Sequence, residues 1–589
     1  MKVNKHFTIF GLKYICGSAA GIIRDRGSIR MCTRRPGFGQ MIYKCLILAC
    51  GLRLAACAAP SAGNGKEVFH YNESDGIATL DPAFAKNKAI MWTVHQLYNT
   101  LVEADKDLHI VPSLAKSWDI SADRRTWVFH LRTDVFFHDN EAFPGGKGRR
   151  MVAGDIVYSF SRIIDKNTAS SGAWIFNDKI EASAGASGNA ITGAFRAIDD
   201  STFQLRLIRP FNPILGLLSM QYCSIVPKEA VTLYGKDFRS HPCGTGPFRF
   251  KSWEEGQALI LLKNEHYFEK DSSGRPLPYL DAIKVSFFDD KATEFLLFRQ
   301  GQLDFINDID PSFKDEVLNK RGELKPQWEG KIRLSTHPYL NTEYLGILVD
   351  TANDRVRNSP LRWRKVRQAI NYGFDRRKMI LYLRNSLSTP AESGFVPAGL
   401  PSFDSSVVKG YHYDPDRARQ LLAEAGYPDG KGMSPIKLLT VATYADFASF
   451  IARELEDLGI HVQVEVMQKG LLLEQTARSQ TPFFVGSWLA DYPDAEDYLG
   501  VFYSRNPAPP NYTRYNNPVF DRLYERAILE NNDSLKMDLY RQMDQIVIND
   551  APVVPLWYDE VIRLVNPRVE GFEPNALNLL ELRRVRIGR

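Results

Sequence analysis

Helix-like and strand-like segments alternate through the second half of the chain, and this alternation constrains the fold more than any other feature. Apolar residues recur with helical spacing over residues 366–383, 416–425, 447–458, 518–529 and 534–548. Short apolar runs at 460–466 and 553–558 predict strands. The first half adds strands of period two at 127–132 and 203–207. This pattern is typical of α/β lobes, in which helices pack against a sheet.

The chain has 589 residues, more than a single hydrophobic core usually serves, so several lobes are expected. Its net charge of +5 comes from the first 56 residues, which hold ten Lys or Arg and one acidic residue, Asp25. The remainder carries 64 basic and 68 acidic residues, a net charge of −4. The charge pattern therefore gives no indication of nucleic-acid binding.

Residues 1–56 are interpreted as an export leader, with Met31 or Met41 as alternative starts. An apolar run at 45–52 is followed by Leu54-Ala55-Ala56-Cys57. This order resembles a bacterial lipoprotein signal, in which small residues precede a cysteine that is cleaved and lipidated. Lipidation of Cys57 is therefore expected, with a plain signal peptide or an unprocessed tail as alternatives.

Residues 57–65 form a linker of small residues, and no other segment reaches the roughly 20 apolar residues that span a bilayer. Beyond Cys57 the chain keeps only two cysteines, Cys223 and Cys243. Because disulfides persist outside the cytoplasm, these two either form a disulfide or remain two separate buried thiols.

The segment Ser487-Trp488-Leu489-Ala490-Asp491-Tyr492-Pro493-Asp494 follows an apolar run at 482–485. It places an aromatic ring and a carboxylate where a buried strand passes into a loop, and such loops often carry ligand contacts. A carboxylate beside a Trp suits a cationic group such as an amine. The alternative is an ordinary turn residue next to a core Trp.

Four groups of motifs occur in order along the chain. They are Leu80-Asp81-Pro82 with Leu97-Tyr98-Asn99-Thr100-Leu101; Gly244-Thr245-Gly246-Pro247-Phe248 with Asn264-Glu265-His266-Tyr267; Val366-Arg367-Gln368-Ala369-Ile370-Asn371-Tyr372 with Tyr413-Asp414-Pro415; and the segment 488–494. Together they resemble the extracytoplasmic solute-binding proteins of peptide ABC transporters, the dipeptide- and oligopeptide-binding family called solute-binding protein family 5. The resemblance covers about residues 67–560.

The resemblance implies an α/β two-lobe clamp of the periplasmic-binding-protein type, with an extra subdomain and a hinge of two crossovers. One lobe is expected to be discontinuous and to combine residues 66–102, 236–330 and 553–589. Residues 103–235 would be a subdomain attached to it, and residues 331–552 would be the other lobe. Closure of such a clamp excludes water, so that a few charged contacts become strong.

In peptide binders of this family, an Asp in the segment that matches 488–494 holds the peptide α-ammonium. The matching residue here is Asp491. Trp488 would line a side-chain pocket, with core packing as the alternative. The backbone of Val485, Gly486 and Ser487 would pair with an extended peptide as an added strand.

Two further positions, Tyr339 and Asn341, are expected to line the cleft or to pack between the lobes. The loop at 86–89 would face the cleft from the opposite lobe, or lie solvated. Some oligopeptide binders carry an Arg three residues before the cleft Trp that takes the peptide carboxylate, whereas this chain has Val485. The same oligopeptide binders carry a pair of cysteines, and this chain has Asn341 and Leu489 at the two matching positions. The carboxylate partner and the peptide length therefore remain unassigned.

The resemblance implies capture of peptides, expected to be short, in the periplasm or cell envelope. Delivery to the permease of an ABC transporter would follow, by a monomer held at the membrane through its lipid anchor. Binding of a nickel chelate, haem, an oligosaccharide or a murein peptide, or a sensory role, are the alternatives. The sequence has no His-Glu-x-x-His, Gly-x-Ser-x-Gly or Cys-x-x-Cys, and its eleven His lack metal-ligand spacing. We therefore expect no enzyme, metal site or cofactor.

Overall fold

The computed structural model describes residues 65–181, 183–184, 190–191 and 193–588. The predicted leader, Cys57 and the predicted linker up to residue 64 lie outside the described residues. Within the described part of the chain, no helix combines the length and the apolar character needed to cross a membrane.

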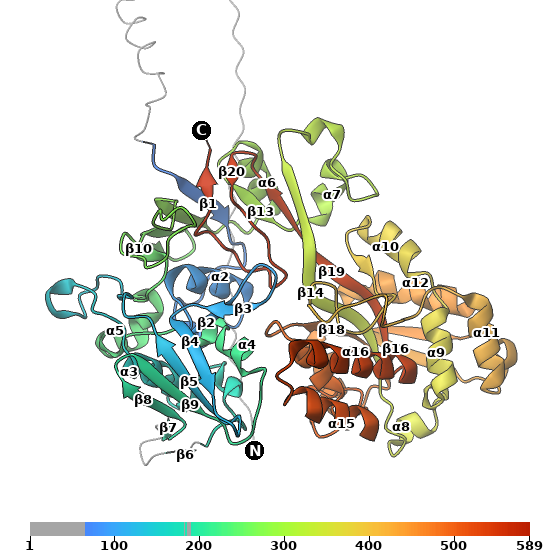
Figure 1. The fold of residues 1–589 in the computed structure, drawn as a ribbon. Helices are drawn as coiled ribbons and strands as arrows, with labels where there is room; N and C mark the ends of the chain where they lie inside the picture. The colour runs from blue at the N-terminus through green and yellow to red at the C-terminus, as the bar shows by residue number, and fades with distance from the viewer. Residues whose placement is uncertain (1–64, 182, 185–189, 192, 589) are drawn as a thin grey trace, which may run out of the picture. The chain divides into compact units, whose positions relative to one another are not determined.

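The largest sheet is built mainly from the second half of the chain (Figure 1). Its strands follow the order β13, β19, β14, β18, β16, β17, and β15 pairs with β19. β14 and β19 run antiparallel along most of their length, whereas β16 is parallel to both β17 and β18. The bounds are β13 Phe305–Asn307, β14 Arg333–Ile347, β15 Thr389–Pro390, β16 Ile436–Thr440, β17 Val462–Val466, β18 Phe483–Leu489 and β19 Val553–Val565.

Helices pack against this sheet because each presents one apolar stripe to it. Buried side chains such as Ile370, Leu421 and Ile451 join Leu345 and Phe483 of the sheet in one hydrophobic core. The helices of this part are α8 Asp354–Arg357, α9 Arg364–Tyr372, α10 Arg376–Arg384, α11 Pro415–Glu424, α12 Ala445–Glu456, α13 Lys469–Ala477, α14 Glu496–Leu499, α15 Pro518–Ala527 and α16 Asp533–Asp550.

Two four-stranded sheets belong to the first half of the chain. One has the order β1, β12, β11, β10, and the other has the order β4, β5, β9, β8. The period-two prediction is confirmed in β5, where Trp127, Phe129 and Leu131 are buried and the residues between them are partly exposed. The strands are β1 Val68–Asn72, β4 Ala115–Ile120, β5 Thr126–Leu131, β8 Phe195–Asp199, β9 Thr202–Arg206, β10 Phe248–Glu254, β11 Ala258–Lys263 and β12 Ala282–Ser286.

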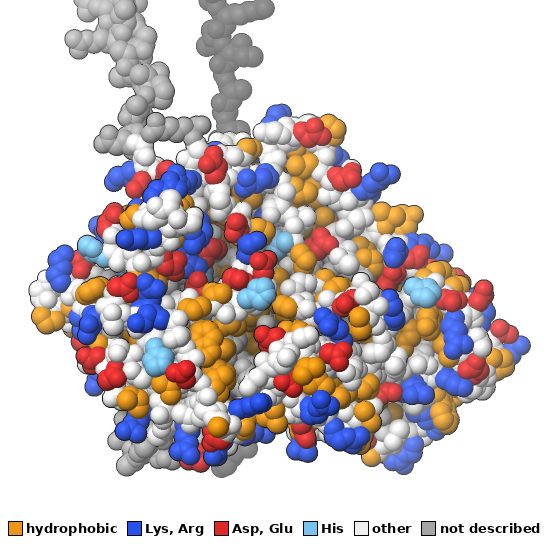
Figure 2. All heavy atoms as spheres, in the orientation of Figure 1, with side chains coloured by type: hydrophobic (Ala, Val, Ile, Leu, Met, Phe, Trp, Pro, Cys, Tyr) orange, Lys and Arg blue, Asp and Glu red, His pale blue; other side chains and the backbone are white. Residues whose placement is uncertain are grey.

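Three strand pairs and six α-helices complete the described strands and α-helices, and short 3-10 helices lie between them. The pairs are β2 Val102–Ala104 with β3 Ile110–Pro112, β6 Ser183–Ala184 with β7 Ala190–Ile191, and β20 Val569–Glu570 with β21 Arg586–Ile587. The helices are α2 Lys88–Leu97, α3 Ala153–Ile164, α4 Ile214–Leu218, α5 Lys228–Tyr234, α6 Lys291–Arg299 and α7 Pro311–Val317. On the face drawn in Figure 2, basic and acidic side chains lie interspersed.

The single helix predicted over 366–383 is wrong, because the structure has two helices there, α9 and α10. Gly373 ends α9, and a Cβ at that position would lie 2.6 Å from the Leu455 side chain. Asp375 then starts α10 by accepting a hydrogen bond from the backbone N–H of Lys378 at 3.0 Å. The predicted helix at 416–425 is confirmed as α11, with Asp414 as its N-cap.

Cys223 and Cys243 are free, buried thiols in the structure, so the disulfide is not formed. The thiol of Cys223 contacts the carbonyl of Leu217 at 3.5 Å, whereas that of Cys243 contacts the carbonyl of His138 at 3.6 Å. Burial raises the pKa of both thiols, which keeps them protonated and unreactive. Of the two alternatives, the structure has the separate buried thiols.

Candidate ligand-binding site

A cavity of about 220 Å³ is lined by parts of the chain that lie far apart in sequence. Helix α2 and the loop before it form one part of its wall, and the loop after β18 forms another. Further parts of the wall come from residues 219–224, Tyr339 and Leu340 of β14, and the C-terminal segment, which we define as residues 575–583. Residues between Asn99 and Ala104, together with Trp174, Pro247 and Tyr267, complete the wall.

Aromatic side chains dominate this wall. They are Trp92, Tyr98, Trp174, Tyr222, Tyr267, Tyr339 and Tyr492. Aromatic rings combine a large apolar surface with a polar edge, and cavities that hold small organic ligands are typically lined in this way.

Asp491 gives the cavity an acidic group that has no basic partner. Its side chain lines the cavity just after the end of β18. In the part of the chain that the structure describes, the Asp491 carboxylate makes no ion pair with a Lys, Arg or His side chain. Asp491 is exposed at the cavity wall, but the surrounding protein still raises the pKa of Asp491 to about 6 by partly limiting its hydration. An unpaired carboxylate of this kind favours a cationic ligand group.

A second carboxylate, that of Asp497 in α14, holds this loop in place. Its Oδ2 accepts hydrogen bonds from the backbone N–H of Asp491 and from Nε1 of Trp488, each at 3.2 Å. Burial first, and then the charges of Asp491 and Glu496, raise the pKa of Asp497 well above its usual range. Two ionised carboxylates so close together repel each other. In the absence of a cationic ligand, the state with only one of the two groups ionised is therefore favoured.

Ligand affinity should therefore depend on pH. A carboxyl group with a pKa of about 6 loses its charge as the pH falls, and a neutral Asp491 cannot pair with an ammonium group. For a peptide with a free α-ammonium, we expect the affinity at pH 5 to be about tenfold lower than at pH 7. Isothermal titration calorimetry at both pH values measures this change, and the Asp491→Asn variant should lose the dependence. Equal affinities of the wild type at the two pH values would contradict the expectation.

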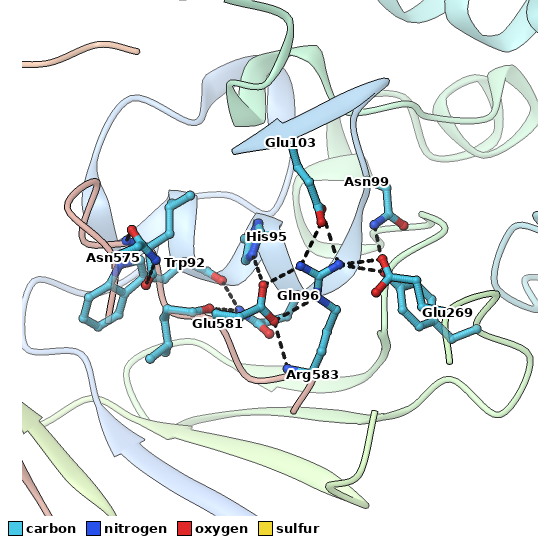
Figure 3. A network of polar contacts seen from close by, with 12 residues as sticks. Trp92, His95, Gln96, Asn99, Glu103, Glu269, Asn575, Glu581 and Arg583 are labelled. Carbon is cyan, nitrogen blue, oxygen red and sulfur yellow. Dashed lines mark hydrogen bonds and ion pairs between the residues drawn. The ribbon is translucent and has the colours of Figure 1, made fainter. Parts of the chain in front are cut away.

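The basic group nearest to the C-terminal end of the wall, Arg583, is fully engaged with acidic side chains (Figure 3). Its guanidinium lies 2.6 Å from Glu269, 3.1 Å from Glu103 and 2.7 Å from Glu581. Burial opposes the charge, but Glu103 and Glu581 nevertheless raise the pKa of Arg583. His95 of α2 contacts Glu581 at 3.1 Å. We call these five side chains the Arg583 cluster.

Hydrogen bonds from α2 fasten the C-terminal segment at the cavity wall. Trp92 Nε1 donates to the carbonyl of Asn578, and Gln96 Nε2 donates to the carbonyl of Leu580, each at 2.6 Å. Arg563 of β19 adds a bond to the side chain of Asn578 at 2.7 Å. One face of α2 thus positions the segment, while residues of α2 also line the cavity.

The family comparison agrees with this architecture. The family model described as "Bacterial extracellular solute-binding proteins, family 5 Middle" matches residues 109–509, well over half of the chain. The chain belongs to this family.

Curated relatives of this family 5 protein match it almost end to end. "Heme-binding protein A" of Haemophilus influenzae is 28% identical over 553 residues, which cover 89% of this chain and 95% of the relative. "Glutathione-binding protein GsiB" of Pectobacterium atrosepticum is 27% identical, with coverage of 89% and 95%. The "Dipeptide-binding protein" of Escherichia coli is 24% identical, with coverage of 90% and 96%.

Solved structures confirm the predicted α/β clamp fold. HbpA2 from Haemophilus parasuis has a TM-score of 0.76 at 22% identity, covering 89% of this chain and 100% of that chain. The periplasmic binding protein DppA from Helicobacter pylori, in complex with the peptide STSA, has a TM-score of 0.67 at 24% identity, with coverage of 89% and 99%. At these identities the likeness shows the fold alone.

The structure brings two of the predicted site residues of this family 5 protein, Asp491 and Tyr339, to the cavity wall. Trp488 lies beside the wall instead, packing against a hydrophobic core next to its bond with Asp497. Asn341 is buried and donates to Glu343 at 2.9 Å and to Asp559 at 2.6 Å. Its side chain is therefore already occupied within the protein.

The three predicted backbone positions lie in β18. This strand pairs with β14 along its whole length, but β16 pairs with it only at Phe484. Within the described residues, the edge of β18 from Val485 onward therefore has no strand partner on that side. Gly486 faces the ring of Tyr344, where a Cβ would come within 2.7 Å of Cζ.

Sequence reasoning missed most of the remaining wall. The loop residues Lys86 and Lys88 line the cavity in agreement with the predicted position of loop 86–89. The contributions of α2, of residues 219–224 and of the C-terminal segment were not predicted. The contribution of α2 could have been recognised from a Trp and a His that lie just before the motif at residues 97–101.

Proposed function

We propose that this family 5 protein binds short peptides through their free α-ammonium and delivers them to the permease of an ABC transporter. The observation that carries the proposal is Asp491, a carboxylate without a basic partner in an aromatic cavity. A peptide ammonium placed there would gain a counter-charge and relieve the repulsion between Asp491 and Asp497. The relatives named for dipeptide and glutathione binding support ligands of this class.

The remaining site residues belong to the same proposal. The free edge of β18 at Val485, Gly486 and Ser487 would add the peptide as a further strand, a contact independent of ligand sequence. Tyr339 would pack against the ligand, whereas Trp488 and Asn341 would support the loop and the strand that carry the ligand contacts.

The setting of the protein is also proposed. Residues 66–102, 236–330 and 553–589 would form one lobe with the subdomain 103–235, and residues 331–552 would form the second. The protein would act as a monomer, without a cofactor and without catalysis. Cys57 would carry lipid at the membrane of the cell envelope, where stable anchoring needs more than one acyl chain.

Haem is the second ligand to consider, because one of the curated relatives is named as a haem-binding protein. Haem has no ammonium group that could pair with Asp491. Binding of haem would therefore leave the Asp491 carboxylate unpaired, which favours a peptide.

Native mass spectrometry of the purified protein tests the ligand class. We expect bound masses that fragment into amino acids and fall in the range of short peptides. A haem mass, or a mass without amino-acid fragments, would contradict the proposal.

Calorimetry with modified peptides tests the role of the ammonium. We expect N-acetylation of a bound peptide to weaken its affinity strongly, since the acetyl group removes the positive charge that Asp491 would pair with. The same peptide methylated at a side chain is the control. Equal affinities of the free and N-acetylated peptides would refute ammonium recognition.

A further inference from the structure

We propose that Lys86 binds the carboxylate of the ligand, so that the cavity selects zwitterionic ligands that are recognised at both ends. This inference rests on the proposed function, because it assigns the end of the peptide that Asp491 does not hold. Lys86 lies in the loop that connects the short 3-10 helix η2 (Pro82–Phe84) to α2.

Four basic side chains line the cavity in the described part of the chain. They are Lys86, Lys88, His95 and Arg583. Lys88 pairs with Glu73 at 3.3 Å, and its ammonium also lies 4.6 Å from the centre of the Trp92 ring. His95 contacts Glu581. In the described part of the chain, Lys86 alone of these four makes no ion pair.

The acidic neighbours of Arg583 make it unsuitable as the carboxylate partner. Three carboxylates share this one guanidinium, with only His95 as a further basic group, so the Arg583 cluster has an excess of negative charge (Figure 3). A ligand carboxylate brought there would be repelled by Glu103, which also lines the cavity. To reach Arg583, the ligand carboxylate would have to replace one of the glutamates, and the guanidinium would be no better neutralised than before.

The backbone around Lys86 is held by local hydrogen bonds. Its N–H donates to the carbonyl of Phe84 at 2.8 Å, and the next residue, Asn87, caps α2 by accepting from the N–H of Ile90 at 3.1 Å. The backbone is thus held on both sides while the Lys86 side chain remains exposed. The N-terminus of α2 adds a positive potential at the same place, which favours an anionic group near Lys86.

The resulting ligand class has a free α-ammonium and a free carboxylate within one short molecule. Asp491 and Lys86 belong to different parts of the cavity wall, the loop after β18 and the loop before α2. Recognition of both ends limits ligand length, because the ligand must span the distance between the two side chains. Short unmodified peptides fit this requirement, whereas peptides with blocked ends do not.

The test compares one dipeptide in three forms, which are unmodified, C-terminally amidated and N-acetylated, by calorimetry at pH 7. For the wild type we expect amidation to weaken binding about tenfold, as for the loss of a charge-assisted hydrogen bond. Lys86→Gln should bind the unmodified peptide about tenfold more weakly and no longer distinguish it from the amide. Lys86→Arg should keep the distinction, and Lys106→Gln, an exposed control outside the cavity wall, should behave as the wild type.

The outcomes separate this inference from the proposed function. If N-acetylation weakens binding but amidation does not, or if Lys86→Gln still distinguishes acid from amide, the role of Lys86 is refuted while peptide binding stands. If the wild type binds none of a panel of unmodified dipeptides and tripeptides, the proposed function and the role of Lys86 both fail.

Discussion

Replacing Arg583 with Met is expected to lower the free energy of unfolding by about 3–5 kcal/mol, the cost of removing one partner from a buried ion-pair network. The Arg583 side chain is only 12% exposed and is the shared partner of Glu103, Glu269 and Glu581. Met retains much of the volume but leaves three partly buried carboxylates beside each other. Urea denaturation at pH 7, followed by circular dichroism, measures the change.

The neighbouring residue provides a matched control for this prediction. Arg584 is exposed, so Arg584→Met should change the free energy of unfolding by no more than about 0.5 kcal/mol. Arg583→Lys should fall between the wild type and Arg583→Met, because Lys keeps the charge but loses the forked geometry. If Arg583→Met and Arg584→Met were equally stable, the network would contribute little to folding.

The second large effect is on binding. Asp491→Ala is expected to weaken the affinity for peptides with a free α-ammonium by about 2–5 kcal/mol, because the ligand ammonium then has no counter-charge in the cavity. Calorimetry at pH 7 measures the loss. The thermal unfolding midpoint of the variant should stay close to that of the wild type, since Asp491 makes no ion pair in the described structure.

A double-mutant cycle with the ligand isolates the ammonium contact. N-acetylation and Asp491→Ala should each weaken binding, but together they should cost little more than either alone. Asp494→Ala serves as a control in the same loop, because the Asp494 carboxylate lies 3.7 Å from Lys536 and does not line the cavity. Additive losses would mean that Asp491 and the ammonium act independently, and the proposed contact would be wrong.

Local sequence signals predicted most of the fold. The N-cap Asp414 and the apolar spacing after it gave α11, and alternating residues gave β5, because both signals depend on neighbours in sequence. The break between α9 and α10 was missed because the apolar spacing continues on both sides of it. Its signals are local, since Gly373 ends α9 and the Asp375 side chain caps α10.

The candidate site was predictable only where a motif carried the signal. Asp491 belongs to one of the four ordered motifs that together resemble the family, and the structure places it in the cavity wall. The C-terminal segment could not be found in this way. Its bonds to Trp92 and Gln96 join residues more than 480 positions apart, and no local pattern encodes such a pairing.

The position of the C-terminal segment has a consequence for the order in which the protein matures. β19 lies between β13 and β14 in the large sheet, and residues 575–583 complete the cavity wall. Neither can form until the last part of the chain has left the ribosome and become available to the earlier part. The cavity wall is therefore completed only once residues 575–583 can pack against α2, and a nascent chain that still lacks them has an incomplete binding site.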